Sequence, residues 1–496
     1  MKLNNETLKT LCPDACLRPT KTRVLQFGEG NFLRAFVDRM LDDANQNIGF
    51  DAGVTVIQPI ARGLVGALND QDGLYTLILR GVVNGQVSKD RRIVRSVLGG
   101  IDPYADFDAY LAAARDENVR FVVSNTTEAG IAYSETDAFD DRPQTSFPAK
   151  VTRLLWERFQ AFGGRKGSGF IFLACELIDD NGQKLEACVK KTAERWQLGA
   201  DFLRFIDEEN VFCSTLVDRI VTGYPKGEVE ELQKEFGYED NLIDTGEPFG
   251  LWVIECPEWV EKEFPLDKAG CPVVFTRDVK PYKMRKVRML NGAHTSMVCA
   301  GYLSGLDTVG ECMADEQLRA FMTKALYGEI MDQLPLDRAD LESFAKAMYE
   351  RFENPFNRHM LLSIALNSVS KYTARVLPSV KAYQAAKGGD LPKCLTLGLS
   401  ALIAFYRGAK FTENGDFVGT RGADSYTVLD DAYALKAFDA MPALDDPAAL
   451  AKAALKDSKL WGEDLTAIPG LEALVAQQLK TIHAEGMRAA IAAALE

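Results

Sequence analysis

The spacing of hydrophobic residues predicts alternating strands and helices over the first half of the chain. Val24-Leu-Gln-Phe27 is a short apolar run typical of a buried strand, and it leads into Gly28-Glu-Gly30. Apolar residues then recur at helical spacing from about Phe32 to Asn45, and Val54-Thr-Val-Ile57 forms a second apolar run. Together they make a strand–glycine turn–helix–strand unit at the N-terminus.

Strands continue beyond this unit. Asn84-Gly85 lies between two β-rich runs and indicates a hairpin, because both turn residues must accept positive φ. Residues 121–124 and 170–175 are further buried runs, and residues 149–162 show helical spacing. Strands that alternate with helices are typical of a parallel, doubly wound α/β sheet.

The pattern changes near Pro281, beyond which helical periodicity dominates and strand-like runs nearly vanish. Alanine-rich amphipathic segments occupy residues 432–441, 447–454 and 471–495. A chain of 496 residues exceeds the usual size of one domain. We therefore expect a doubly wound α/β domain over residues 1–280 and a mostly α-helical domain over residues 281–496.

Composition and charge exclude several classes of protein. The net charge of −14 would repel nucleic acid, although a local basic patch can still bind a small anion. The ten cysteines are scattered without a Cys-x-x-Cys pair, which argues against a zinc site and for reduced thiols. No signal core and no apolar run of membrane-spanning length are present, so we expect a soluble cytoplasmic protein without a metal.

The glycine turn is a candidate nucleotide site. Gly28 and Gly30 stand where a dinucleotide fold needs a tight turn and close approach of the backbone to a pyrophosphate. The third glycine of the usual pattern is replaced by Leu33. The second strand ends in Ile57-Gln58-Pro59 with no carboxylate for the adenosine ribose, and Arg62 follows. The residues themselves leave NAD and NADP open.

Lys286, Asn291 and His294 are the candidate catalytic residues. They supply an amine that can move a proton, an amide that can stabilise an oxyanion and an imidazole that can orient either group. Asn291 and His294 share a face of a predicted helix. An ideal α-helix separates Lys286 from Asn291 by about 140°.

The neighbours of Lys286 favour a neutral amine. Lys283, Arg285 and Arg288 crowd it with like charge, and partial burial would act in the same direction. Such an amine would act as a base in alcohol oxidation and as an acid in ketone reduction. The alternative is a basic surface helix with one core histidine.

Two motifs resemble signatures of the mannitol dehydrogenase family, the polyol-specific long-chain dehydrogenases. They are Lys286-x4-Asn291-x2-His294 and Gly28-Glu-Gly30-Asn-Phe32-Leu-Arg34. Stretches similar to the hexuronate branch of that family cover residues 25–38, 174–179, 351–355, 366–371 and 375–379.

The resemblance implies a Rossmann-type N-terminal domain, a mostly helical C-terminal domain, NAD as cofactor and no metal. It implies that Lys286 is the general acid/base, that Asn291 belongs to the oxyanion hole and that His294 positions the substrate. The residues expected to bind the cofactor are Phe27, Gly28, Gly30, Asn31, Phe32, Gln58, Asn125 and Glu128.

Two departures from mannitol-type members concern the substrate. Leu177 stands where those members carry an asparagine of the oxyanion hole, and Lys283 stands where they carry a glutamate. Replacing an acid by a base favours a substrate with a carboxylate. We therefore expect a small sugar acid, and the resemblance to the hexuronate branch implies interconversion of tagaturonate and altronate. The candidate residues for the substrate carboxylate are Lys283, Arg288, Lys371 and Arg375, and the resemblance implies that Asp218 also lies near the substrate.

Three other substrates remain open within the family: fructuronate, mannitol and a sugar-alcohol phosphate. An alternative from another class is a catalytically silent NAD-binding protein that senses redox state. The sequence predicts no oligomeric state.

Overall fold

An eight-stranded sheet organises the first half of the chain in the computed structural model, which describes residues 1–11, 18–127 and 129–496. Six neighbouring strands are parallel, in the order β5-β2-β1-β6-β7-β8, and β10 and β11 extend the sheet beyond β8, with β10 antiparallel to it. The strand bounds are β1 Thr22–Phe27, β2 Gly53–Ile57, β5 Val97–Ile101, β6 Phe121–Ser124, β7 Ile171–Ala174, β8 Val211–Asp218, β10 Leu251–Glu255 and β11 Val273–Thr276. The predicted doubly wound sheet is confirmed.

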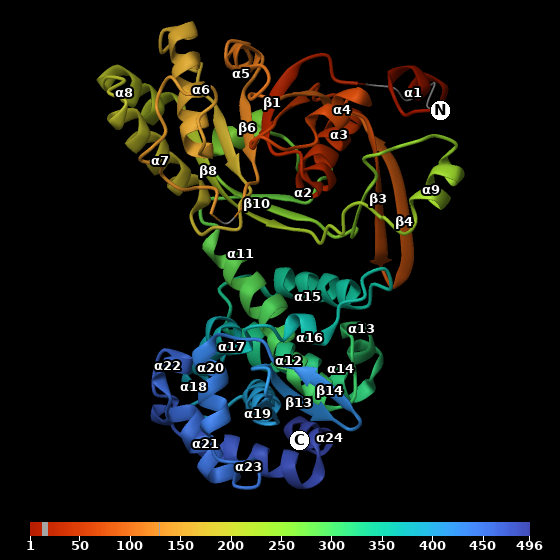
Figure 1. Cartoon of the computed structure of the whole chain (residues 1–496), viewed down its shortest axis with the longest axis vertical. Helices are drawn as coiled ribbons and strands as arrows, with labels where there is room; N and C mark the ends of the chain where they lie inside the picture. Colours follow the sequence, from red (N-terminus) through yellow and green to blue (C-terminus); the bar gives the residue numbers. More distant parts are fainter. Residues whose placement is uncertain (12–17, 128) are drawn as a thin grey trace. The chain divides into compact units, whose positions relative to one another are not determined.

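Helices cover both faces of this sheet (Figure 1). Along β6 and β7 successive side chains enter different cores, because neighbouring residues of a strand point to opposite faces. One core is closed by α5 Phe107–Ala113, α6 Phe147–Phe162, α7 Asn181–Arg195 and α8 Ala200–Glu209. The other is closed by α2 Asn31–Ala35, α3 Val37–Ile48, α4 Val65–Asp70 and α10 Glu258–Glu263.

The strand order places a topological switch point beside β1. The chain passes from β1 to β2 on one side and later returns to β6 on the other, with Phe27 paired to Ile57 and to Ser124. Ligands of doubly wound sheets bind outside the carboxyl ends of the strands at such a point. The Gly28–Gly30 turn follows directly from the carboxyl end of β1.

The predicted hairpin is present in a second, smaller sheet of order β4-β3-β9. Asn84 and Gly85 have φ values of 52° and 76°, as a tight hairpin turn requires. The strands are β3 Tyr75–Val83, β4 Gln86–Val94 and β9 Asp244–Gly246; α1 Asn5–Leu11 and α9 Val229–Phe236 complete the elements of this half.

The chain divides into two compact units. One contains residues 1–80 and 87–279, and the other contains residues 81–86 and 280–496. The second unit is mostly helical, as predicted, and α19 Lys393–Arg407 is buried from Cys394 to Tyr406. No helix among the described residues is long and apolar enough to cross a membrane.

α19 packs against α12, α17, α20, α23 and α24, and the bounds of all the remaining helices of the second unit follow. They are α11 Lys280–Arg285, α12 Gly292–Leu303, α13 Val309–Ala314, α14 Glu316–Thr323, α15 Arg338–Phe352, α16 Leu361–Ile364, α17 Ser368–Arg375, α18 Leu377–Ala386, α20 Ala432–Ala440, α21 Pro447–Lys456, α22 Ser458–Trp461, α23 Leu471–Glu485 and α24 Met487–Leu495, with shorter turns η1 Lys286–Asn291, η2 Lys324–Ile330, η3 Met331–Gln333 and η4 Leu465–Ala467.

Two features of the second unit differ from the sequence prediction. A three-stranded sheet, β12 Ala409–Phe411, β13 Phe417–Arg421 and β14 Asp424–Thr427, lies in a region expected to be helical. Its strands have only three to five residues, too few to show a period. The expected helix over residues 471–495 is broken at Gly486, whose φ of 89° is left-handed.

Candidate functional site

The candidate catalytic residues lie on one helical segment that contains a π turn. α11, η1 and α12 follow one another without interruption from Lys280 to Leu303, and the π turn begins at Lys286 and ends at Asn291. Hydrogen bonds in a π turn join residues five apart, so Lys286 and Asn291 lie one turn apart. The 140° separation expected from an ideal α-helix therefore does not apply.

Asn291 has an available amide. Its side chain is half-buried and makes no hydrogen bond within the described part of the chain, while its backbone carbonyl accepts from Thr295 Oγ1 at 2.8 Å. The next residue, Gly292, allows α17 to approach: a Cβ there would lie 3.1 Å from the carbonyl oxygen of Arg375. An amide donor and the end of α17 are thus held side by side.

The ring of His294 contacts two other rings. Its ring stacks on Phe352 with centroids 4.1 Å apart, and it meets His359 edge to face at 5.4 Å. Its Nε2 atom is buried without a hydrogen-bond partner among the described residues. Burial, followed by the nearby charges of His359, Arg351 and Arg375, lowers the pKa of His294 well below its ordinary value. The imidazole is neutral at neutral pH.

Four candidate substrate-binding cations differ in their partners. Lys371 Nζ donates to the Ile364 carbonyl at 2.8 Å, and Arg288 Nη1 donates to Ser379 Oγ at 3.2 Å. Arg375 is half-buried and makes no hydrogen bond or ion pair within the described part of the chain. Burial lowers the pKa of each of these three side chains and of Lys283. Arg375 is therefore the strongest of the four as a ligand for an anion.

The glycine turn has the backbone that a close ligand requires. Gly28 has a φ of 123°, and a Cβ there would come within 3.3 Å of Leu33 Cδ1. Space in front of Gly30 is open, because nothing lies within 4 Å of a Cβ built on it. Exposed Asn31 accepts from Arg34 Nη2 at 2.6 Å, and Phe32 stacks on Phe36 at 4.9 Å.

The other described residues that are expected to bind the cofactor lie at the carboxyl ends of the strands. Gln58 is buried at the end of β2, and Asn125 follows β6 and donates to the Cys175 carbonyl at 2.7 Å. The Phe27 side chain is buried between Tyr110 and Phe147, so only its backbone borders the turn. Asp218 is buried at the end of β8, and Glu128 lies outside the described residues.

The described residues of the loop after β7 provide no free side-chain amide. Leu177 is 66% exposed, and the carboxylate of Glu176 accepts from Ser124 Oγ and from the Thr126 backbone and hydroxyl. Asn181 is the next asparagine, but its amide donates to the carbonyls of Ala174, Glu176 and Thr215. Its donors are already used within the fold.

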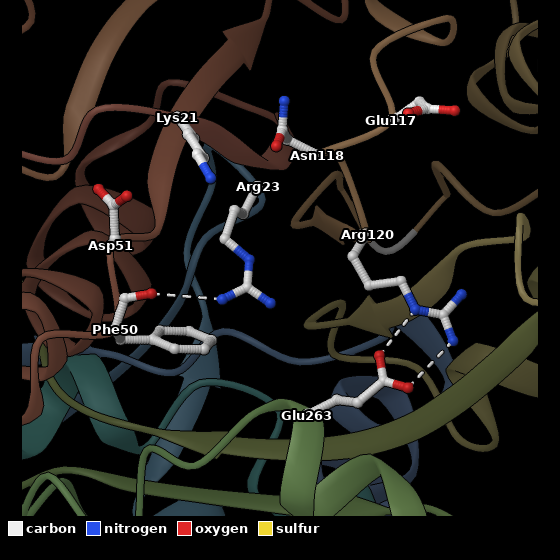
Figure 2. A pocket seen from close by; sticks show the side chains of 8 residues that line it. All are labelled: Lys21, Arg23, Phe50, Asp51, Glu117, Asn118, Arg120 and Glu263. Carbon is white, nitrogen blue, oxygen red and sulfur yellow. Dashed lines mark hydrogen bonds and ion pairs between the residues drawn. The ribbon is translucent and has the colours of Figure 1, made fainter.

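A pocket of about 530 Å³ lies at the opposite, amino ends of the strands (Figure 2). Arg120 pairs there with Glu263 at 2.8 Å, and Arg23 lies over the ring of Phe50 at 4.6 Å. Its three basic and three acidic side chains leave no net charge to select an anion. We therefore assign the candidate cofactor site to the carboxyl ends.

Sequence reasoning did not place Arg351, Phe352 or His359 in the site. Phe352 and His359 contact the ring of His294, and the positive charge of Arg351 helps to lower the pKa of His294. The sequence did contain a sign of their importance, because residues 351–355 are one of the stretches that carry the family resemblance. The contact with His294 could not be predicted, because these residues are far from residue 294 along the chain.

A Rossmann-type unit followed by a helical unit with an amine, an amide and an imidazole on one helix defines a two-domain dehydrogenase. Residues 22–268 match the Mannitol dehydrogenase Rossmann domain, and residues 278–483 match the Mannitol dehydrogenase C-terminal domain. The chain belongs to the mannitol dehydrogenase family, and the resemblance found in the sequence is confirmed.

Individual relatives agree with this assignment. Altronate oxidoreductase of Yersinia pestis bv. Antiqua (strain Nepal516) is 48% identical over 480 residues, which cover 95% of this chain and 96% of that protein. The structure of D-sorbitol dehydrogenase in substrate-free form has a TM-score of 0.80 at 23% identity and covers 99% of this chain and 100% of that chain. Pseudomonas fluorescens mannitol 2-dehydrogenase, in a ternary complex with NAD and D-mannitol, has a TM-score of 0.65 at 21% identity, with 99% of both chains covered. These two structures share the fold.

The lowered pKa of His294 predicts a pH dependence of stability. The unfolded histidine titrates near 6.5. Because the folded pKa is lower, the unfolded state binds the proton first, and the free energy of unfolding falls as the pH drops below about 6.5, by at most about 1.4 kcal/mol per pH unit. In His294→Phe, which keeps an aromatic ring on Phe352, chemical denaturation between pH 5 and 8 should show a shallower fall. His483→Gln, at an exposed position, is the control. An unchanged slope in His294→Phe would contradict the assignment.

Proposed function

We propose that the chain is an NAD-dependent oxidoreductase that interconverts altronate and its keto acid, tagaturonate. Relatives with about half of their residues identical over nearly the whole chain are altronate oxidoreductases. The family supplies the class of reaction, in which an alcohol is oxidised or a ketone is reduced.

The observation that carries the substrate class is the half-buried Arg375 guanidinium without an internal partner. A desolvated cation is costly unless an anion or a set of acceptors compensates it. Arg375 influences the pKa of His294, and its carbonyl borders Gly292. A substrate carboxylate would therefore complete the charge beside the candidate catalytic residues, which a neutral polyol would not do.

The three candidate catalytic residues then have separate roles. In the reductive direction Lys286 gives a proton to the substrate oxygen, and it takes that proton back in alcohol oxidation. The free amide of Asn291 donates to the same oxygen while negative charge develops on it. Neutral His294 orients the substrate or Lys286 through hydrogen bonds, and it neither gains nor loses a proton.

The glycine turn fits a dinucleotide. The positive φ of Gly28 and the open space at Gly30 let a pyrophosphate approach the backbone, and Gln58 and Asn125 lie at the ends of the adjoining strands. When bound, the nicotinamide supplies or accepts the hydride. Asp218 belongs to the same proposal as a residue that contacts the substrate.

A cytoplasmic location is part of the proposal. The described cysteines, from Cys175 to Cys394, are free thiols, which suits a reducing compartment. The partner of the protein is a small sugar acid.

Replacing Lys286 tests the acid/base assignment. In Lys286→Met, kcat for tagaturonate reduction should fall by about 10²–10⁴-fold, the usual contribution of a positioned proton donor, with little change in NADH affinity. Lys381→Met is a matched control, since Lys381 is paired with Glu463 on the surface. Steady-state NADH oxidation and a binding titration measure the two quantities. Unchanged turnover in Lys286→Met would contradict the acid/base role. A parent chain that binds NADH but reduces no hexuronate would instead favour a silent NAD-binding protein.

Replacing Arg375 tests the substrate class. In Arg375→Leu, kcat/KM for tagaturonate should fall about 10- to 100-fold, as expected for a lost charge-assisted hydrogen bond, with a much smaller effect on the neutral ketose fructose. Arg338→Leu is the control, because Arg338 pairs on the surface with Asp332 and Glu342. An equal loss for both sugars would refute the carboxylate contact. A parent enzyme that prefers fructose to tagaturonate would refute the substrate class.

A further inference from the structure

We propose that Glu29, the residue between the two glycines of the turn, binds the adenosine ribose and makes the enzyme select NAD over NADP. In dinucleotide folds this role belongs to an acid at the end of the second strand. Here that strand ends in Ile57-Gln58, so the usual acid is missing. The inference rests on the proposed use of a nicotinamide dinucleotide and goes beyond it, because it assigns the residue that distinguishes the two forms.

The carboxylate of Glu29 lies beside the end of the second strand. Glu29 Oε1 accepts from the Leu64 backbone N–H at 3.1 Å. A Cβ built on Gly63 would lie 2.1 Å from Glu29 Oε1 and 2.5 Å from Gln58 Oε1. Gly63 therefore leaves room for two side chains that converge at the position where the acid normally stands.

The second carboxylate oxygen has no partner. Glu29 is 7% exposed, and its Oε2 is buried without a hydrogen bond among the described residues. A buried acceptor left unpaired is costly, and this cost would be relieved by an O–H donor. The 2′-hydroxyl of NAD is such a donor, whereas the 2′-phosphate of NADP would bring negative charge against the carboxylate.

Arg34, the basic residue closest in sequence to Glu29, makes no ion pair with the Glu29 carboxylate within the described part of the chain. Arg34 donates from Nε to the Glu29 carbonyl, from Nη1 to the Leu242 carbonyl and from Nη2 to Asn31 Oδ1. These bonds fix the backbone of the turn without neutralising the Glu29 side chain by direct pairing.

Charge near Glu29 acts in both directions. Burial raises the pKa of Glu29 and nearby Asp102 adds to the rise, while the backbone N–H groups of Leu64 and of Glu29 itself and the charge of Arg34 lower it. The exposed Arg62 is the competing feature, since an arginine at this place can accept a 2′-phosphate. The buried, unpaired acceptor favours Glu29 as the determinant.

The test compares dissociation constants of NADH and NADPH, measured by nucleotide fluorescence without any sugar. In Glu29→Gln, NADH affinity should fall about tenfold, as for a hydrogen bond to a charged acceptor, and NADPH affinity should rise, so that the preference for NADH drops by more than about tenfold. In Glu29→Asp, the charge remains on a shorter side chain, so NADH should weaken while NADPH stays rejected. Thermal melting compares the stability of both variants with that of the parent chain.

Two controls separate Glu29 from its surroundings. Asp102→Asn removes a neighbouring negative charge and should change the NADH preference far less than Glu29→Gln. Arg62→Ala should leave NADH affinity unchanged. If Asp102→Asn reproduces the shift of Glu29→Gln, or if Glu29→Gln keeps the parent preference, the assignment is overturned.

The parent chain distinguishes this inference from the proposed function. A parent that prefers NADH but reduces no hexuronate refutes the proposed activity and leaves the Glu29 assignment standing. A parent that reduces tagaturonate with both nucleotides at equal affinity overturns the Glu29 assignment and leaves the activity standing. A parent that binds neither nucleotide refutes both.

Discussion

The π turn from Lys286 to Asn291 is the constraint on which the account of this chain depends. In a regular α-helix a proton-transferring lysine and an amide five residues later point in different directions. The i→i+5 hydrogen bonds of the π turn place them one turn apart, so both can address one substrate oxygen. Such turns are rare, and their frequent occurrence at functional sites matches this use.

The surroundings hold this turn in place and give the site its charge. α17 packs close to Gly292, and the ring of Phe352 supports His294. His294 and Arg375 are both removed from water. Burial keeps His294 neutral, and it makes the charge of Arg375 destabilising unless an anion pairs with it. One packing arrangement thus yields a neutral imidazole and a cation suited to a sugar acid.

Much of the fold follows from local pattern. The runs at residues 24–27 and 121–124 become β1 and β6, and Asn84-Gly85 forms the expected hairpin, because period, apolar content and turn chemistry are properties of short segments. The π turn was not predicted, since no local pattern distinguishes it from an α-helix. The strands from Ala409 to Thr427 were missed because their stability comes from pairing with one another.

The candidate site shows the same division. Lys286, Asn291 and His294 are close in sequence and were proposed from their residue types and spacing, and Arg375 was proposed as one of four cations for a substrate carboxylate. Whether a cation has a partner depends on three-dimensional contacts, so the sequence could not rank Arg375 above Lys371 or Arg288. The open acceptor of Glu29 was likewise hidden, because it depends on the loop around Gly63.

Moving the lysine by one residue tests the central claim most directly. In the double variant Lys286→Met/Val287→Lys the amine lies four residues before Asn291, a spacing that a regular α-helix aligns and that the π turn does not. We expect this variant to keep its helical circular dichroism and cooperative melting, and its kcat for tagaturonate to stay at least about 100-fold below that of the parent chain, the cost of misplacing a catalytic group by about 1 Å. A double variant that regains the turnover of the parent chain would contradict the claim that the π turn aligns Lys286 with Asn291.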